Sequence, residues 1–104
     1  MEHRFVIFSE NISYLSNIKQ LFGTENISCV SALDDVTGAF MKDHINILII
    51  DTDISEHSYM ELLDKASFYP ARVNFYSVTM VKGNFVCDGE IVSDPADYFK
   101  RKAG

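Results

Sequence analysis

The sequence predicts a single α/β domain built on a parallel sheet with helices on both faces. The chain has 104 residues, of which 47% are hydrophobic, enough to fill one core but not two. Short apolar runs without polar alternation, typical of strands buried on both faces, occur at residues 5–8, 27–30, 46–51 and 73–78. Helical patterns separate these runs, and the connections are short. This alternation is typical of parallel strands joined by right-handed crossovers.

Each predicted helix shows apolar residues at three- and four-residue spacing together with a start or stop signal. The predicted helices run from Ser9 to Gly23, from Asp34 or Asp35 to Met41, and from Ser58 to a residue before Pro70. Ser9 is the expected cap of the first helix, and Gly23 supplies a left-handed residue at its end. We therefore expect three helices to connect the four strands.

The last quarter of the chain departs from this alternation. Residues 84–87 and 90–92 are short apolar runs that flank Asp88-Gly89, a dipeptide that favours a type I′ hairpin turn. Asp94-Pro95 then has the pattern of a helix cap followed by proline in the first helical position. The sequence predicts a hairpin and a short final helix here, with no helix between the fourth strand and the hairpin.

Composition excludes several classes of function. The formal net charge of −6 disfavours direct binding to nucleic acid or to anionic lipid. The longest apolar run, residues 45–50, is too short to span a membrane, and the N-terminus does not resemble a signal peptide. Cys29 and Cys87 lack a Cys-x-x-Cys spacing, and no nucleophile lies at motif spacing from a base. We expect a cytoplasmic protein that is not an enzyme and has reduced cysteines.

Polar residues gather where the predicted strands end, which is where parallel α/β sheets place their functional sites. Ser9-Glu10, Asp51 and Ser77 follow or end the first, third and fourth strands. This set resembles the phosphorylation site of the receiver domains of response regulators. Residues 51–63 also run without gaps along that family's Asp-x-x-Met-Pro-x-Met-Asp-Gly-x-Glu-Leu pattern. The resemblance covers roughly residues 4–78.

The resemblance implies a fold and a set of roles. The fold is a flavodoxin-like three-layer α/β/α sandwich with a central parallel sheet, in which the hairpin and short helix replace the family's fourth helix, fifth strand and fifth helix. Asp51 is the implied phosphoacceptor, and Glu10, Asp51 and Asp53 are the implied ligands of Mg²⁺. Ser77 is the implied switch hydroxyl, and Lys100 is our choice for the family's phosphate-binding lysine.

The alternatives at these positions remain open at this point. Arg101 or Lys102 could replace that lysine instead, Asp51 could be a turn or capping aspartate, and Glu10 could belong to the first helical turn. Ser9 takes the place of the family's first acidic residue, and Tyr59 that of its loop glycine. These departures predict that phosphorylation at Asp51 is weak or lost.

The resulting expectation is a divergent receiver-like module, or pseudo-receiver, of a two-component phosphorelay. It would act by binding a protein, either a sensor kinase or a downstream regulator. The alternative function is a small-molecule-binding or structural, dimerising flavodoxin-like domain. A hairpin in place of the fourth helix would expose a strand edge through which a homodimer could form.

Overall fold

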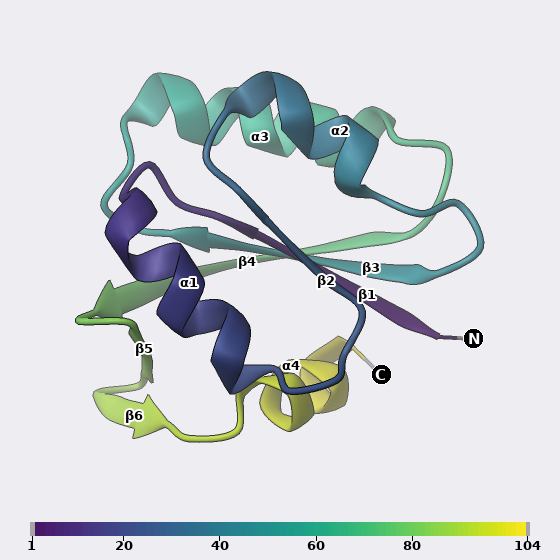
Figure 1. The fold of residues 1–104 in the computed structure, drawn as a ribbon. Coiled ribbons are helices and arrows are strands. Elements are labelled where there is room, and N and C mark those ends of the chain that lie inside the picture. The colour runs from purple at the N-terminus through teal and green to yellow at the C-terminus, as the bar shows by residue number, and fades with distance from the viewer. Residues whose placement is uncertain (1, 104) are drawn as a thin grey trace.

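The computed structural model describes residues 2–103 of the predicted single domain, 1–104; residues 1 and 104 lie outside that range. Strands and helices alternate up to the fourth strand (Figure 1). The strands are β1 (His3–Phe8), β2 (Ile27–Val30), β3 (Ile45–Asp51), β4 (Val73–Val81), β5 (Asn84–Cys87) and β6 (Glu90–Val92). The helices are α1 (Ile12–Leu21), α2 (Val36–Ala39), α3 (Glu56–Phe68) and α4 (Pro95–Ala103), and a 3-10 turn, η1 (Leu33–Asp35), precedes α2.

The six strands form one mixed sheet in the order β2-β1-β3-β4-β5-β6. The first four are parallel, whereas β5 and β6 pair antiparallel with their neighbours. The prediction of a flavodoxin-like central parallel sheet is therefore wrong. The cause is a second hairpin turn, Lys82-Gly83, where φ is 50° and 81°. A two-residue turn of this kind reverses the chain and forces antiparallel pairing.

The hairpin predicted at Asp88-Gly89 is confirmed. These two residues have φ of 54° and 81°, and Cys87 pairs with Glu90 across the turn. The final helix is also present, with Pro95 as its first residue. Cys29 and Cys87 are both free thiols, and burial raises the pKa of the Cys29 thiol.

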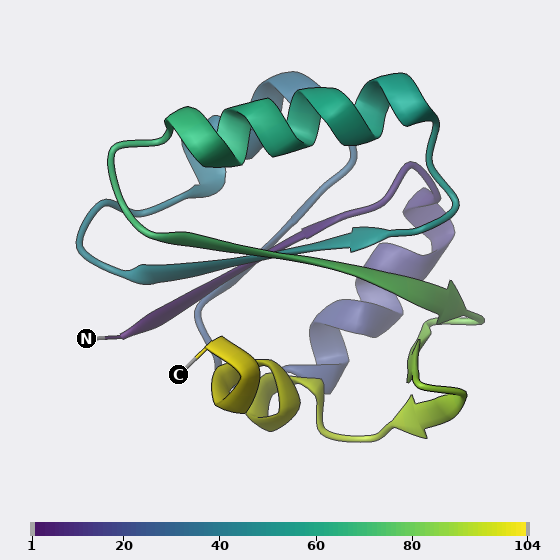
Figure 2. The same ribbon diagram turned by 180° about the vertical axis from the view of Figure 1, so that it is seen from behind.

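Helices lie on both faces of the sheet, with α2 and α3 on one side and α1 and α4 on the other (Figures 1 and 2). Alternation along the buried strands fills both layers. In β1, Phe5 and Ile7 join the core beneath α1 and α4, while Val6 and Phe8 join the core beneath α3. Phe85 of β5 is fully buried in the first of these cores, so the hairpin contributes to the interior of the domain.

The ends of the helices differ from the sequence predictions. The first helix has Asn11, not Ser9, at its cap position. The third begins at Glu56, because the Ser55 hydroxyl accepts a hydrogen bond from the Ser58 N–H at 3.2 Å and so caps the helix. The second is only one turn long, since Phe40 is extended and buried against Tyr69.

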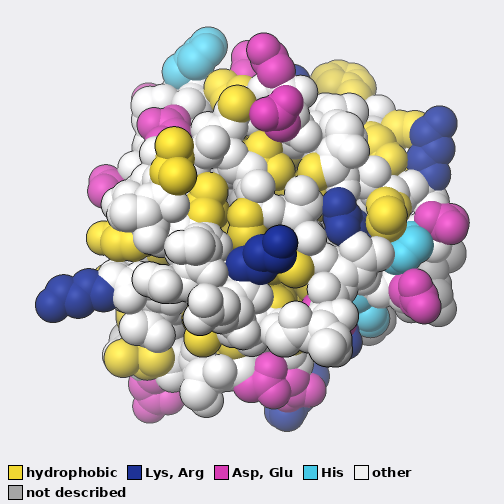
Figure 3. Space-filling model, in the orientation of Figure 1, with side chains coloured by type: hydrophobic (Ala, Val, Ile, Leu, Met, Phe, Trp, Pro, Cys, Tyr) yellow, Lys and Arg dark blue, Asp and Glu magenta, His cyan; other side chains and the backbone are white. Residues whose placement is uncertain are grey.

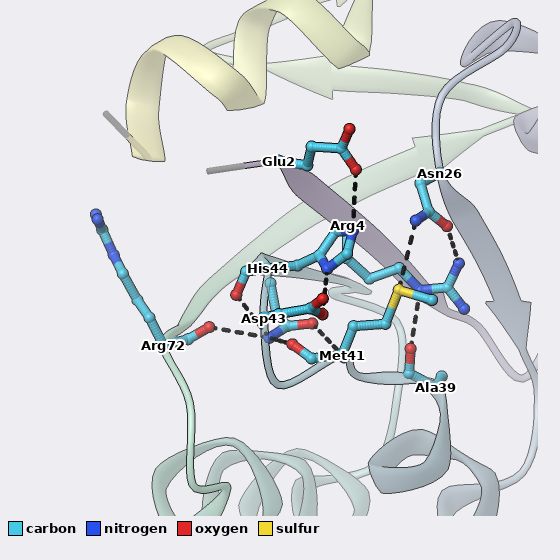
Figure 4. Close-up of polar contacts among 9 residues, drawn as sticks. Glu2, Arg4, Asn26, Ala39, Met41, Asp43, His44 and Arg72 are labelled. Atoms are coloured by element: carbon cyan, nitrogen blue, oxygen red, sulfur yellow. Dashed lines mark hydrogen bonds and ion pairs between the residues drawn. The ribbon is translucent and has the colours of Figure 1, made fainter.

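A buried polar cluster at the amino ends of the parallel strands holds the loops before β3 and β4 (Figure 4). Asn46 is fully buried, and its amide nitrogen donates to the carbonyl oxygens of Met41, His44 and Arg72 at 2.9, 3.3 and 3.1 Å. Its side-chain oxygen accepts from the Met41 N–H at 2.8 Å. Asn46 thereby links the loop before β3 to Arg72 at the start of β4, and it supplies the acceptor for the Met41 N–H.

None of the helices between residues 2 and 103 has the length and apolar character needed to cross a bilayer.

Candidate functional site

The predicted site lies at the carboxyl edge of β1 and β3. These strands are parallel neighbours with Phe8 opposite Ile50, so the residues that follow, Ser9 and Asp51, come to lie side by side. An open depression of about 510 Å³ is found here. Its lining consists of Glu10, Asn11, Ile12, Tyr14, Asp51, Asp53 and Met80. Three carboxylates predicted to share a site thus border the same depression.

Asp51 is buried, with 5% of its surface exposed, and both of its carboxylate oxygens accept hydrogen bonds from the chain. Oδ1 accepts from the backbone N–H of Asp53 at 3.1 Å, and Oδ2 accepts from the Ser9 hydroxyl at 3.5 Å. The bond to residue i+2 is an Asx turn, which holds the loop that follows the strand. Ser9 is itself fully buried and accepts from the Asn11 N–H at 3.1 Å. Asp51 therefore ties the β3 loop to the start of α1.

Glu10 is held by the first turn of α3. Its Oε1 accepts from the Ser58 hydroxyl at 3.0 Å, and the Ser58 hydroxyl in turn accepts from the Ser55 hydroxyl at 3.0 Å. This chain of hydrogen bonds joins the loop after β1 to the N-terminus of α3. The sequence analysis identified Ser58 only as a helix start and gave Ser55 no role in the site. Serines three residues apart are a capping signal that could have placed the helix start at Ser55, but no local pattern indicates the contact between Ser58 and Glu10.

The acidic residues do not form a complete cation site. Among residues 2–103, no group of three or more His, Cys, Asp or Glu side chains is arranged to hold a metal ion. One Glu10 oxygen already accepts from Ser58, and both Asp51 oxygens have donors of their own. Asp53 is exposed, and its contact with Asp51 is made by its backbone. The donor set does not fit the predicted Mg²⁺ site, and no chemical step is assigned to that ion.

Ser77 is not brought to Asp51. β4 continues to Val81, so Ser77 lies within the strand and pairs with Ile50, while Val78 pairs with Asp51. Paired residues on parallel strands share a face, and successive residues alternate. Ile50 faces α3 and Val78 faces α1, so Ser77 and Asp51 point to opposite faces. Ser77 instead borders a separate depression of about 290 Å³.

The three C-terminal cations lie elsewhere too. Lys100 forms an ion pair with Glu25, in the loop that precedes β2 at the amino edge of the parallel strands. Arg101 pairs with Asp97 on the same helix, and the Lys102 Nζ lies 5.1 Å from the centre of the Tyr98 ring. α4 ends near the start of β4, where the Arg72 guanidinium donates to the Ala103 carbonyl. Among the lining residues of the Asp51 depression there is no Lys or Arg.

Comparisons with family models, with curated proteins and with solved structures find no match for this chain. The resemblance to receiver domains therefore stays a prediction that depends on its own sequence motifs.

Proposed function

We propose that this chain is a divergent receiver-like signalling module that acts by binding another protein, and that Asp51 has kept the place of a phosphoacceptor but lost or nearly lost its role. One observation carries the proposal. Both Asp51 oxygens are engaged inside the chain, by the Ser9 hydroxyl and by the Asp53 N–H. The aspartate therefore acts as a structural residue at the end of β3.

The chemistry of an aspartyl phosphate supports this reading. Phosphoryl transfer to a carboxylate requires an accessible oxygen and a cation that neutralises the incoming charge. The product controls a switch only if a hydroxyl and a cation bind it differently in two conformations. The hydroxyl of Ser77 and the ammonium group of Lys100, which the resemblance assigns to these tasks, lie on another face and at another edge of the sheet. A phosphoryl group on Asp51 would lack the partners that convert its charge into movement.

The surface supports a protein as the binding partner. Acidic and basic side chains are interspersed on the face shown in Figure 3, and the net charge is −6, which disfavours a polyanionic partner. At the rim of the Asp51 depression, Ile12 is 70% exposed beside Glu10. An apolar side chain next to carboxylates suits contact with a protein better than contact with a phosphate ion.

The proposal can be tested by amide NMR spectroscopy. The purified chain is treated with Mg²⁺ and beryllium fluoride, or with acetyl phosphate, and its spectra are compared with those of an Asp51→Asn variant treated in the same way. We expect the two proteins to respond alike, with no shifts that spread from residue 51 into β4. Shifts at Ser77 and along β4 that occur in the wild type and are absent from the variant would contradict the proposal.

A further inference from the structure

β4 has one edge that is only partly covered. β3 pairs with it along residues 73–78, and on the opposite side β5 pairs only with residues 79–81. Among residues 2–103 no strand lies beside the outer edge of residues 73–78. In Figure 2, β4 is the strand nearest the viewer, with α3 above it and α4 below, and no other segment crosses in front of it. A six-residue stretch of sheet edge is therefore open.

The direction of the backbone groups on this edge follows from the hydrogen bonds to β3. The carbonyl of Val78 accepts from the Thr52 N–H at 2.9 Å, and that of Arg72 accepts from the Asn46 N–H at 3.0 Å. Backbone groups alternate in direction along a strand, so residues with even numbers face β3 and those with odd numbers face outward. Thr79 and Val81 meet β5, in agreement with this alternation. Val73, Phe75 and Ser77 thus each present an unpaired N–H and C=O.

This edge also lacks the features that usually prevent strand pairing. Exposed edges are commonly protected by charges, prolines, bulges or short length. β4 reads Val-Asn-Phe-Tyr-Ser-Val-Thr-Met-Val, with no charge, proline or glycine. The terminal strands of the sheet are shorter, and β6 begins with Glu90. Among the edges of the sheet between residues 2 and 103, the open part of β4 is therefore the longest, and it carries no charged side chain.

We propose that a second copy of this chain occupies the edge, with β4 of the two copies paired antiparallel about a two-fold axis at Phe75. In this register Val73 of each copy lies opposite Ser77 of the other, and Phe75 lies opposite Phe75. The outward groups of the two strands then satisfy one another, as an isologous interface requires. The depression of about 290 Å³ beside the edge, which Ser77 and Tyr98 border, leaves room for side chains of the incoming strand.

The charges of α4 favour a second copy over an unrelated strand. α4 runs antiparallel to β4, because Phe99 contacts Tyr76 while the Ala103 carbonyl accepts from Arg72. A two-fold axis at Phe75 therefore sets the two α4 helices antiparallel on the same side of the extended sheet. The beginning of α4 is acidic and its last turn is basic, so the axis sets the acidic end of each helix level with the basic end of the other. An extended segment of another protein would need to supply this complementarity separately.

This inference rests on the proposed function, since it names the protein that the module binds, yet the two can fail separately. The NMR response to beryllium fluoride tests the role of Asp51 and does not depend on whether the chain dimerises. The molecular mass tests the β4 edge and does not depend on whether Asp51 is phosphorylated.

The experiment measures mass by sedimentation velocity and light scattering from low micromolar to near-millimolar concentration, together with amide hydrogen exchange. We expect the mass to double with concentration, and the amides of Val73, Phe75 and Ser77 to become protected in the same range. Ser77→Pro removes the outward N–H and places a ring on the edge, so it should remain monomeric, whereas Ser77→Thr keeps the N–H and should dimerise. Circular dichroism shows whether the proline variant is folded.

If Ser77→Pro does not fold, Ser77→Lys tests the same edge by adding a charge and should weaken the dimer. A wild-type chain that stays monomeric, with these three amides exchanging freely at every concentration, would overturn the proposal and leave the edge to an extended segment of another protein. A dimer that persists in the proline variant and leaves the three amides unprotected would overturn it as well, because the dimer would then use another surface.

Discussion

Replacing Asp51 by asparagine and by alanine distinguishes a structural aspartate from a phosphoacceptor through the sign of the change in stability. Alanine removes the acceptor of the Asp53 N–H, which lies 3.1 Å from Oδ1 of a residue that is 5% exposed. A hydrogen bond to a charged acceptor contributes about 1.5–3 kcal/mol to stability. The hydrogen bond from the Ser9 hydroxyl, at 3.5 Å, is the weaker of the two that Asp51 accepts. We expect Asp51→Ala to lower the free energy of unfolding by about 2 kcal/mol.

Asparagine keeps a carbonyl oxygen that can face the Asp53 N–H, so Asp51→Asn should cost less than about 1 kcal/mol. Both values are measured by urea unfolding at neutral pH, followed by circular dichroism. Asp53→Ala is the matched control, because its exposed side chain is lost while its backbone N–H stays, and it should change stability by less than about 0.5 kcal/mol.

An increase in stability on substitution of Asp51 would refute this reasoning. Glu10, Asp51 and Asp53 border one depression, and carboxylates gathered for function repel one another at the expense of stability. If either substitution at Asp51 raises the urea midpoint, the aspartate is a functional acidic group and not a structural one.

Three further predictions concern the core, the loops and pH. Phe85→Ala should lower the free energy of unfolding, measured with urea, by about 3–5 kcal/mol. Ile91→Ala, at a 68% exposed site of the same hairpin, should lower it by less than about 0.5 kcal/mol. Equal effects of the two substitutions would mean that the hairpin is not part of the core. Asn46→Ala should cost about 2–4 kcal/mol and speed amide exchange in the loops before β3 and β4; unchanged exchange would contradict its role in holding them. Burial, followed by the charge of Lys100, lowers the pKa of His3 below 6.5, so stability is complete above that pH and falls as the pH drops toward the lowered value. His3→Gln should flatten this decline in thermal unfolding across that range, and an unaltered decline would assign it to other groups.

The sequence predicted those parts of the fold that are encoded locally. Asp88-Gly89 is a strong turn signal, because both residues readily adopt positive φ, and the hairpin is there. Lys82-Gly83 forms the same kind of turn, but lysine is not typical of its first position, so the end of β4 was placed at Val78, three residues early. That error hid the pairing of β4 with β5 and led to the wrong sheet.

The sequence predicted only the part of the candidate site that lies on two adjacent parallel strands. Ser9 and Asp51 meet because β1 and β3 run parallel side by side, which the alternation of elements implies. The position of Ser77 depends on the register of β4 against β3, and a shift of one residue moves a side chain to the other face. Lys100 depends on the direction of α4, which the preceding hairpin sets. The local pattern of hydrophobic residues predicts neither the register of β4 nor the direction of α4.

The turn at Lys82-Gly83 accounts both for the separation of Ser77 and Lys100 from Asp51 and for the open edge of β4. A fifth strand parallel to β4 would have covered Val73, Phe75 and Ser77, but the chain turns back at Gly83 instead. The turn lies close to α1, where position 83 favours glycine, since φ is 81° and a Cβ there would lie 3.0 Å from the Asn17 Cβ. Beyond the turn, Phe85 is fixed between Phe22 and Phe99. Because this packing holds the hairpin on α1, the outer edge of residues 73–78 stays uncovered by another strand and α4 places its cations away from Asp51.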